Sequence, residues 1–104
     1  MNFPTVLVIP AALYAIYRFT RQSFTMYHAT WCGHCKQAMP AWSEFTYPGV
    51  VIRSVEQRFN FERQVRGYPT FVYRSGTGEE AVYHGPRSVE GWAAFLDSQT
   101  KVPA

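Results

Sequence analysis

The two cysteines of this chain, Cys32 and Cys35, stand three positions apart in the segment WCGHC, and the sequence contains no others. Disulfide bonds therefore cannot tie distant parts of the chain together, as they do in small secreted scaffolds with several cysteine pairs. A disulfide between these two would close a very short loop, which adds little stability through chain entropy. The fold must instead be held together by a hydrophobic core.

The composition is sufficient for one such core. The chain has 104 residues, enough for a single small domain, and 47% of them are apolar and 17% aromatic. The net charge of +3 is mildly basic, but the Lys and Arg residues are scattered singly. No nucleic-acid-binding motif is present, so we expect no nucleic acid partner.

A metal site is a weak explanation of the cysteine pair. A structural zinc ion needs four ligands, and the chain offers two Cys with three His: His28, His34 and His84. His34 lies between the cysteines, where helix geometry makes ligation by all three awkward. We therefore expect no metal and no cofactor.

The apolar segment at residues 3–17, FPTVLVIPAALYAIY, has no charged side chain and is followed by Arg18 and Arg21. A membrane anchor would be at the short edge of a span, and a signal peptide would need a charged start and a cleavage site. A helix packed on a sheet should show a polar face, which this segment lacks. We treat residues 1–22 as an apolar N-terminal segment, either a membrane anchor or a packed helix.

The rest of the chain alternates between strand and helix patterns. Apolar spacing and turn residues predict strands at 23–30, 50–56, 69–74 and 80–84, and helices at 32–45, at 59–66 and after Ser88. The order β-α-β-α-β-β-α predicts an α/β fold in which a βαβ unit is followed by a hairpin. We expect a central mixed sheet of about four strands flanked by helices.

Cys32 falls where the first strand ends and a helix begins. The free N–H groups and dipole of a helix start favour an anion, so they favour the Cys32 thiolate as the attacking species. Cys35, about one turn on, should face inward and resolve the mixed disulfide. We expect His34 to stabilise that thiolate, with a merely solvated His34 as the alternative. Gly33 would let a substrate backbone come close, and Trp31 would either shelter the pair or lie in the core.

These residues resemble a known family. The segment YHATWCGHCKQAMPAW resembles the active site of thioredoxin-fold proteins, and CGHC is the form typical of protein disulfide isomerase domains. Gly67-Tyr68-Pro69-Thr70 resembles the family's cis-proline loop, and YHGPRSVEGWAAFL (83–96) is similar to its Tyr-x-Gly-x-Arg pattern. The resemblance covers about residues 23–98, which implies a thioredoxin-like domain at 23–104.

The resemblance implies a thiol–disulfide oxidoreductase or isomerase that forms, reduces or rearranges disulfides in cysteine-containing proteins through a Cys32–Cys35 disulfide. It implies that Pro69 is cis and lies against the cysteines. The Tyr68 backbone would then pair with an extended substrate strand, and Trp31 and Tyr68 would line its groove. We expect a monomer. The alternatives are a thioredoxin-like reductase and a non-catalytic peptide-binding or membrane-tethered adaptor.

One residue departs from the family pattern. The family places a buried acid six residues ahead of the first cysteine, where it helps to remove the proton of the resolving cysteine, and this chain has Met26 there. Glu44 and Glu56 are the candidates to replace it, but the sequence places neither of them near Cys35.

The sequence contains features that point to two different cellular compartments. An isomerase-like site suggests the lumen or membrane of the endoplasmic reticulum. Arg18 and Arg21, which follow the apolar segment, would instead hold the catalytic domain on the cytosolic face if that segment spans a membrane.

Overall fold

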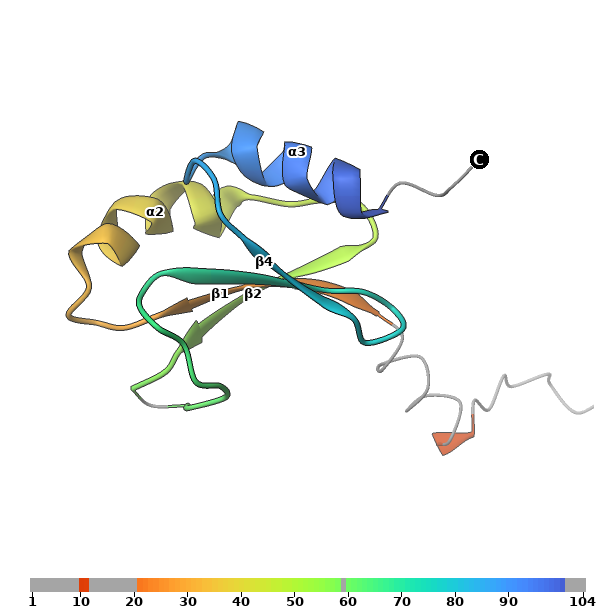
Figure 1. The fold of residues 1–104 in the computed structure, drawn as a ribbon, viewed down its shortest axis with the longest axis horizontal. Helices are drawn as coiled ribbons and strands as arrows, with labels where there is room; N and C mark the ends of the chain where they lie inside the picture. The colour runs from red at the N-terminus through yellow and green to blue at the C-terminus, as the bar shows by residue number, and fades with distance from the viewer. Residues whose placement is uncertain (1–9, 12–20, 59, 101–104) are drawn as a thin grey trace, which may run out of the picture.

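The computed structural model of the chain describes residues 10–11, 21–58 and 60–100 (Figure 1). The interpretation of residues 3–17 as an anchor or a packed helix therefore lies almost wholly outside the described residues. Within the described ranges, no helix is both long and apolar enough to cross a membrane.

A four-stranded mixed sheet with two helices forms the described domain (Figure 1). Its elements are β1 (Gln22–His28), α2 (Gly33–Glu44), β2 (Val50–Glu56), β3 (Thr70–Arg74), β4 (Glu80–Tyr83) and α3 (Val89–Thr100). The strand order is β2-β1-β3-β4, in which β1 pairs with β2 in parallel and the other pairs are antiparallel. This arrangement confirms the predicted thioredoxin-like α/β fold.

The two faces of the sheet follow from the alternation of side chains along each strand. Phe24 and Met26 of β1 are fully buried in the main core, toward the face that α2 and α3 cover (Figure 1). Tyr27 points to the opposite face, where it packs with Val55 and Val72 in a smaller cluster. The helix face therefore carries most of the apolar burial.

Trp42 of α2 lies at the centre of the main core. Its ring centroid is 5.2 Å from that of Phe24, 5.1 Å from that of Phe71 and 4.9 Å from that of Trp92. Its indole N–H donates a hydrogen bond of 3.1 Å to the Arg53 carbonyl of β2, so the ring is satisfied at its polar end as well. One side chain thus joins α2 to β1, β2, β3 and α3.

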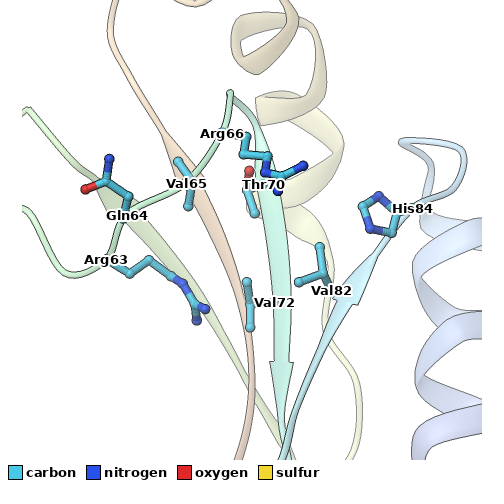
Figure 2. Close-up of a pocket in the computed structure, with 8 residues that line it drawn as sticks. All are labelled: Arg63, Gln64, Val65, Arg66, Thr70, Val72, Val82 and His84. Carbon is cyan, nitrogen blue, oxygen red and sulfur yellow. The ribbon is translucent and has the colours of Figure 1, made fainter.

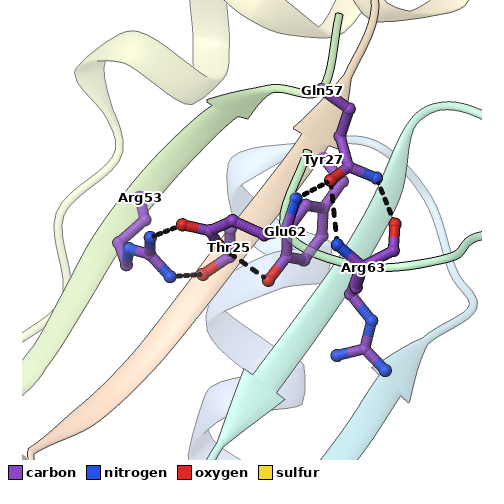
Figure 3. Close-up of polar contacts among 6 residues, drawn as sticks. All are labelled: Thr25, Tyr27, Arg53, Gln57, Glu62 and Arg63. Carbon is purple, nitrogen blue, oxygen red and sulfur yellow. Dashed lines mark hydrogen bonds and ion pairs between the residues drawn. The ribbon is translucent and has the colours of Figure 1, made fainter. Parts of the chain in front are cut away.

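The helix predicted at 59–66 is wrong for the residues that the structure describes there. Residues 60–66 form an irregular loop, and Phe61 is exposed instead of facing a core. The buried Gln57 side chain explains the difference (Figure 3): its Oε1 accepts the N–H groups of Glu62 at 2.8 Å and Arg63 at 3.1 Å. Those N–H groups are then bound to a side chain, which competes with helix formation.

Ionic contacts fasten this loop to the face of the sheet opposite the helices. Arg53 of β2 pairs with Glu62 at 2.7 Å, and the Tyr27 hydroxyl donates to the same carboxylate at 3.4 Å (Figure 3). Arg63 pairs with Glu80 of β4 at 2.9 Å. The loop is therefore tied to three strands without forming a helix.

The predicted start of the last helix is confirmed. Ser88 precedes α3, and its hydroxyl accepts the N–H of Gly91 at 3.1 Å, which satisfies one of the free donors of a helix start. The buried residues of α3 are Trp92 and Leu96, which face the sheet.

We predict that Trp42→Ala lowers the free energy of unfolding by about 3–5 kcal/mol, because it empties the centre of the aromatic core. Trp31→Ala is the matched control, since Trp31 is 72% exposed, and it should cost less than about 1 kcal/mol. Urea unfolding followed by circular dichroism measures both values. Equal losses in the two variants would contradict this description of the core.

Candidate functional site

Cys32 occupies the N-cap position of α2. Its backbone is extended, with φ −87° and ψ 113°, and its sulfur accepts the N–H of Cys35 at 3.1 Å. The Cys32 N–H donates to the Ala29 carbonyl at 3.1 Å, which turns the chain from β1 into the helix. The sulfur thus lies at the positive end of the helix dipole with a backbone donor directed at it, an arrangement that stabilises a thiolate.

Cys35 is the more buried of the two cysteines, at 2% exposed against 6% for Cys32. Burial and the hydrogen bond between its thiol and Cys32 raise the pKa of Cys35 to about 12, while the positive charge of Arg87 acts in the opposite direction. The two sulfurs are unequal, because a backbone N–H is directed at the Cys32 sulfur whereas the Cys35 thiol holds its proton.

The loop predicted to carry a cis proline lies next to this pair. The Tyr68–Pro69 peptide bond is cis, and Tyr68 packs against the cluster formed by Ala29, Cys32 and Cys35. The Trp31 ring meets the Tyr68 ring edge to face, with centroids 5.6 Å apart. Since Trp31 is 72% exposed, the alternative of a core tryptophan is wrong.

The two residues between the cysteines lie at the surface. A side chain at Gly33 would meet no atom within 4 Å, so the space in front of its Cα is open. His34 is exposed in the first turn of α2 and lines a pocket of about 450 Å³ with Arg87 and Pro86. Both positions are therefore accessible to a molecule that approaches Cys32.

Met26 is fully buried in the main core, at the position where the family pattern expects an acid. Of the two glutamates considered as replacements, Glu44 is the last residue of α2 and is exposed, at the opposite end of the helix from the cysteines. Glu56 instead lines a pocket with Cys35. This pocket has a volume of about 440 Å³ and is lined by His28, Ala29, Thr30, Cys35, Lys36, Met39 and Glu56.

The pairing of His28 with Glu56 was not predicted from the sequence. These are the last residues of β1 and β2, and they are direct partners in the parallel register. The alternation of side chains along a strand could have placed both residues on the helix face. His28 lies two residues after Met26, and Glu56 lies four residues after Ile52. The placement of α2 over that face was needed to connect them to Cys35.

The two carboxylate oxygens of Glu56 have different surroundings. Oε1 accepts the backbone N–H of Arg58 at 2.8 Å. Oε2 is buried without a hydrogen-bond partner and lies 3.5 Å from Nδ1 of His28, within ion-pair distance when the imidazole is protonated. A buried oxygen that accepts no hydrogen bond is unusual in a folded protein.

A third pocket lies on the other face of the sheet (Figure 2). It has a volume of about 340 Å³ and is lined by Arg63, Gln64, Val65, Arg66, Thr70, Val72, Val82 and His84. It contains neither cysteine, although Thr70 directly follows Pro69. Within the described part of the chain, no three His, Cys, Asp or Glu side chains gather closely enough to hold a metal ion.

Comparison with known families matches residues 16–98 to the family described as Thioredoxin. The chain is 36% identical over 84 residues to protein disulfide-isomerase tigA of Aspergillus niger, covering 69% of this chain and 23% of that protein. It is 31% identical over 86 residues to protein disulfide-isomerase 1 of Caenorhabditis elegans, covering 75% of this chain and 18% of that protein. The chain thus spans about a fifth of the length of these curated relatives.

Among solved structures, the chain is similar to the J-Trx1 fragment of ERdj5, with a TM-score of 0.69 and 23% identity. That match covers 77% of this chain and 42% of the fragment. The Trx4 domain of ERdj5 has the same TM-score of 0.69 at 15% identity, and the match covers 79% of this chain and 82% of that domain. At these identities the structural likeness shows the fold alone.

We predict that a short pulse of iodoacetamide at pH 8 labels Cys32 of the reduced protein and leaves Cys35 unlabelled. Only thiolates react, and with a pKa of about 12 Cys35 stays protonated until the pH rises toward that value. Peptide mass spectrometry locates the label, and protein unfolded in guanidinium, which should carry label on both cysteines, is the control. Equal labelling of both in the folded protein would contradict the asymmetry.

Proposed function

This chain belongs to the thioredoxin family, and on that premise we propose that it is a thiol–disulfide oxidoreductase like a protein disulfide isomerase domain. It forms, reduces or rearranges disulfides in cysteine-containing proteins through a Cys32–Cys35 disulfide. The observation that carries the proposal is the hydrogen bond of 3.1 Å from the Cys35 N–H to the Cys32 sulfur at the start of α2, with Cys35 buried behind it.

The asymmetry of the two cysteines assigns the steps. In the reducing direction, the Cys32 thiolate attacks a substrate disulfide and forms a mixed disulfide, and the first substrate sulfur leaves with the electron pair. Cys35 then attacks the Cys32 sulfur, the Cys32–substrate bond breaks, and the second substrate sulfur leaves as a thiolate. Two electrons pass to the substrate, and the Cys32–Cys35 disulfide is formed. Oxidation of a substrate dithiol runs these steps in reverse.

Substrate contact is assigned to the surface around the pair. The exposed Trp31 ring and the Tyr68 ring that it contacts offer an apolar surface beside Cys32. Pro69 has no N–H, and an extended substrate segment would pair with the backbone of Tyr68 at this edge. The open space at Gly33 leaves room for that segment to approach the sulfur.

His34 favours the oxidising direction. An imidazole in the first turn of α2 that interacts with the Cys32 thiolate stabilises the dithiol form, which makes the disulfide the stronger oxidant. A redox potential close to that of thioredoxin would support the alternative of a thioredoxin-like reductase instead.

We predict that Cys32→Ser abolishes insulin reduction and the reactivation of scrambled ribonuclease, because the attacking sulfur is lost. Cys35→Ser should still form mixed disulfides with substrate but should fail to release them, so covalent complexes accumulate on non-reducing gels. Ser43→Ala, an exposed change on the same helix, is the control and should match the unchanged protein. Activity that survives Cys32→Ser would favour the non-catalytic adaptor.

We propose the endoplasmic reticulum, in its lumen or at its membrane, as the place of action, because an isomerase-like site needs an oxidising compartment. The cytosolic face of a membrane is the alternative, and residues 3–17 are the proposed means of membrane association. Fractionation of cells that express the full chain, followed by protease protection of the membrane pool, separates the two locations.

A further inference from the structure

The proposed reaction requires Cys35 to lose its proton, although its surroundings favour the protonated thiol. The Cys35 side chain is 2% exposed, so bulk solvent has little direct contact with it. Burial is the first of the causes that raise its pKa to about 12. Met26, the residue of β1 in the family's acid position, carries no group that can accept a proton. A base must therefore come from another element.

We propose that Glu56 accepts the proton of Cys35 when that cysteine resolves a mixed disulfide, and that the Arg58 N–H holds the Glu56 carboxylate in place. The inference rests on the proposed function and supplies the step that Met26 leaves open. Glu56 and Cys35 line one pocket of about 440 Å³, which is large enough to hold a water molecule between them. Glu56 therefore places a carboxylate, which can accept a proton, at the pocket that Cys35 lines.

The carboxylate is also prepared to receive a proton. Oε1 is held by the Arg58 N–H at 2.8 Å, and this bond fixes the direction of the group. Oε2 is buried and accepts no hydrogen bond from the protein, so it has a free lone pair. Protonation of Oε2 would relieve the cost of a buried, unsatisfied anionic oxygen.

Titratable and charged groups lie in and near this pocket. His28 lies at the end of β1, 3.5 Å from Oε2, and its side chain is 15% exposed, so it reaches solvent. Lys36 of α2 lines the same pocket, and Arg87, between β4 and α3, exerts its positive charge on Cys35. Arg58, directly after β2, contributes its backbone N–H.

The Cys35 S–H bond breaks, and its proton passes to Oε2 of Glu56 through a water molecule that enters the pocket. The thiolate attacks the Cys32 sulfur, the bond from Cys32 to the substrate sulfur breaks, and the substrate leaves as a thiolate that takes a proton from solvent. Glu56 returns its proton to solvent past His28. In the oxidising direction, protonated Glu56 donates to Cys35 as the Cys32–Cys35 disulfide opens.

The test follows the two steps separately in the full chain. Reduced protein is mixed with excess oxidised glutathione, quenched with acid at intervals and analysed by mass spectrometry, which separates the mixed disulfide from the internal disulfide. Glu56→Gln should form the mixed disulfide within about twofold of the unchanged rate and resolve it about tenfold to a hundredfold more slowly at pH 7. Glu44→Gln, the matched change at the exposed end of α2, should alter neither step.

A pH profile separates proton transfer from a merely structural role. Between pH 7 and 9, the resolution rate of Glu56→Gln should rise about tenfold per unit, because hydroxide replaces the lost base, while that of the unchanged protein should rise much less. If Glu56→Gln does not fold, as judged by circular dichroism, Glu56→Asp takes its place and should resolve several-fold more slowly than the unchanged protein.

Resolution at the unchanged rate and with the unchanged pH profile in the folded Glu56 variant would overturn the assignment. That result leaves the proposed function intact, since the mixed disulfide still forms and resolves. Failure of the unchanged protein to form a mixed disulfide at all would instead overturn the proposed function, and the assignment of Glu56 with it.

Discussion

Helix α2 is held on the sheet by the Trp42 side chain, and the geometry of the cysteine pair depends on that contact. The indole packs against Phe24 and Phe71 of the sheet and against Trp92 of α3, and its N–H bonds to the Arg53 carbonyl. Rings of this size account for much of the buried area of a small domain. Trp42 lies in the last turn of α2. Since α2 directly follows β1, fixing that turn on the sheet keeps the first turn over the carboxyl ends of the parallel strands β1 and β2.

That placement makes the two sulfurs chemically different. Cys32, at the N-cap, receives a backbone N–H from the first turn, whereas Cys35, one turn further, faces inward and is almost fully buried. The same placement puts the ends of β1 and β2, with His28 and Glu56, beneath the helix start. The thiol pair therefore lies at a helix N-terminus, which favours an anion, and Cys35 shares a pocket with the half-buried Glu56 carboxylate. A disulfide exchange centre needs a thiolate that can attack and an acceptor for the proton of the resolving cysteine.

Much of the domain was predictable from local pattern. The four strands, the helices α2 and α3 and the Ser88 cap follow from apolar periodicity and turn residues. The helix expected at 59–66 failed because Gln57 binds the N–H groups of Glu62 and Arg63, a competition between a side chain and the backbone that periodicity does not reveal. Ion pairs to β2 and β4 then hold that segment as a loop on the sheet.

The sequence by itself determined that the chain has one redox-capable thiol pair and that this pair starts a helix after a strand. It also determined that Met26 occupies the position where the family pattern has an acid. These statements rest on residue identity and spacing, which are local properties. Only the tertiary structure decided which side chains face Cys35. His28 and Glu56 are 28 positions apart in the sequence, and they meet because β1 and β2 pair in parallel with these two residues in register. Register is a property of the packed sheet, because it depends on which strands become neighbours and on the faces that they bury.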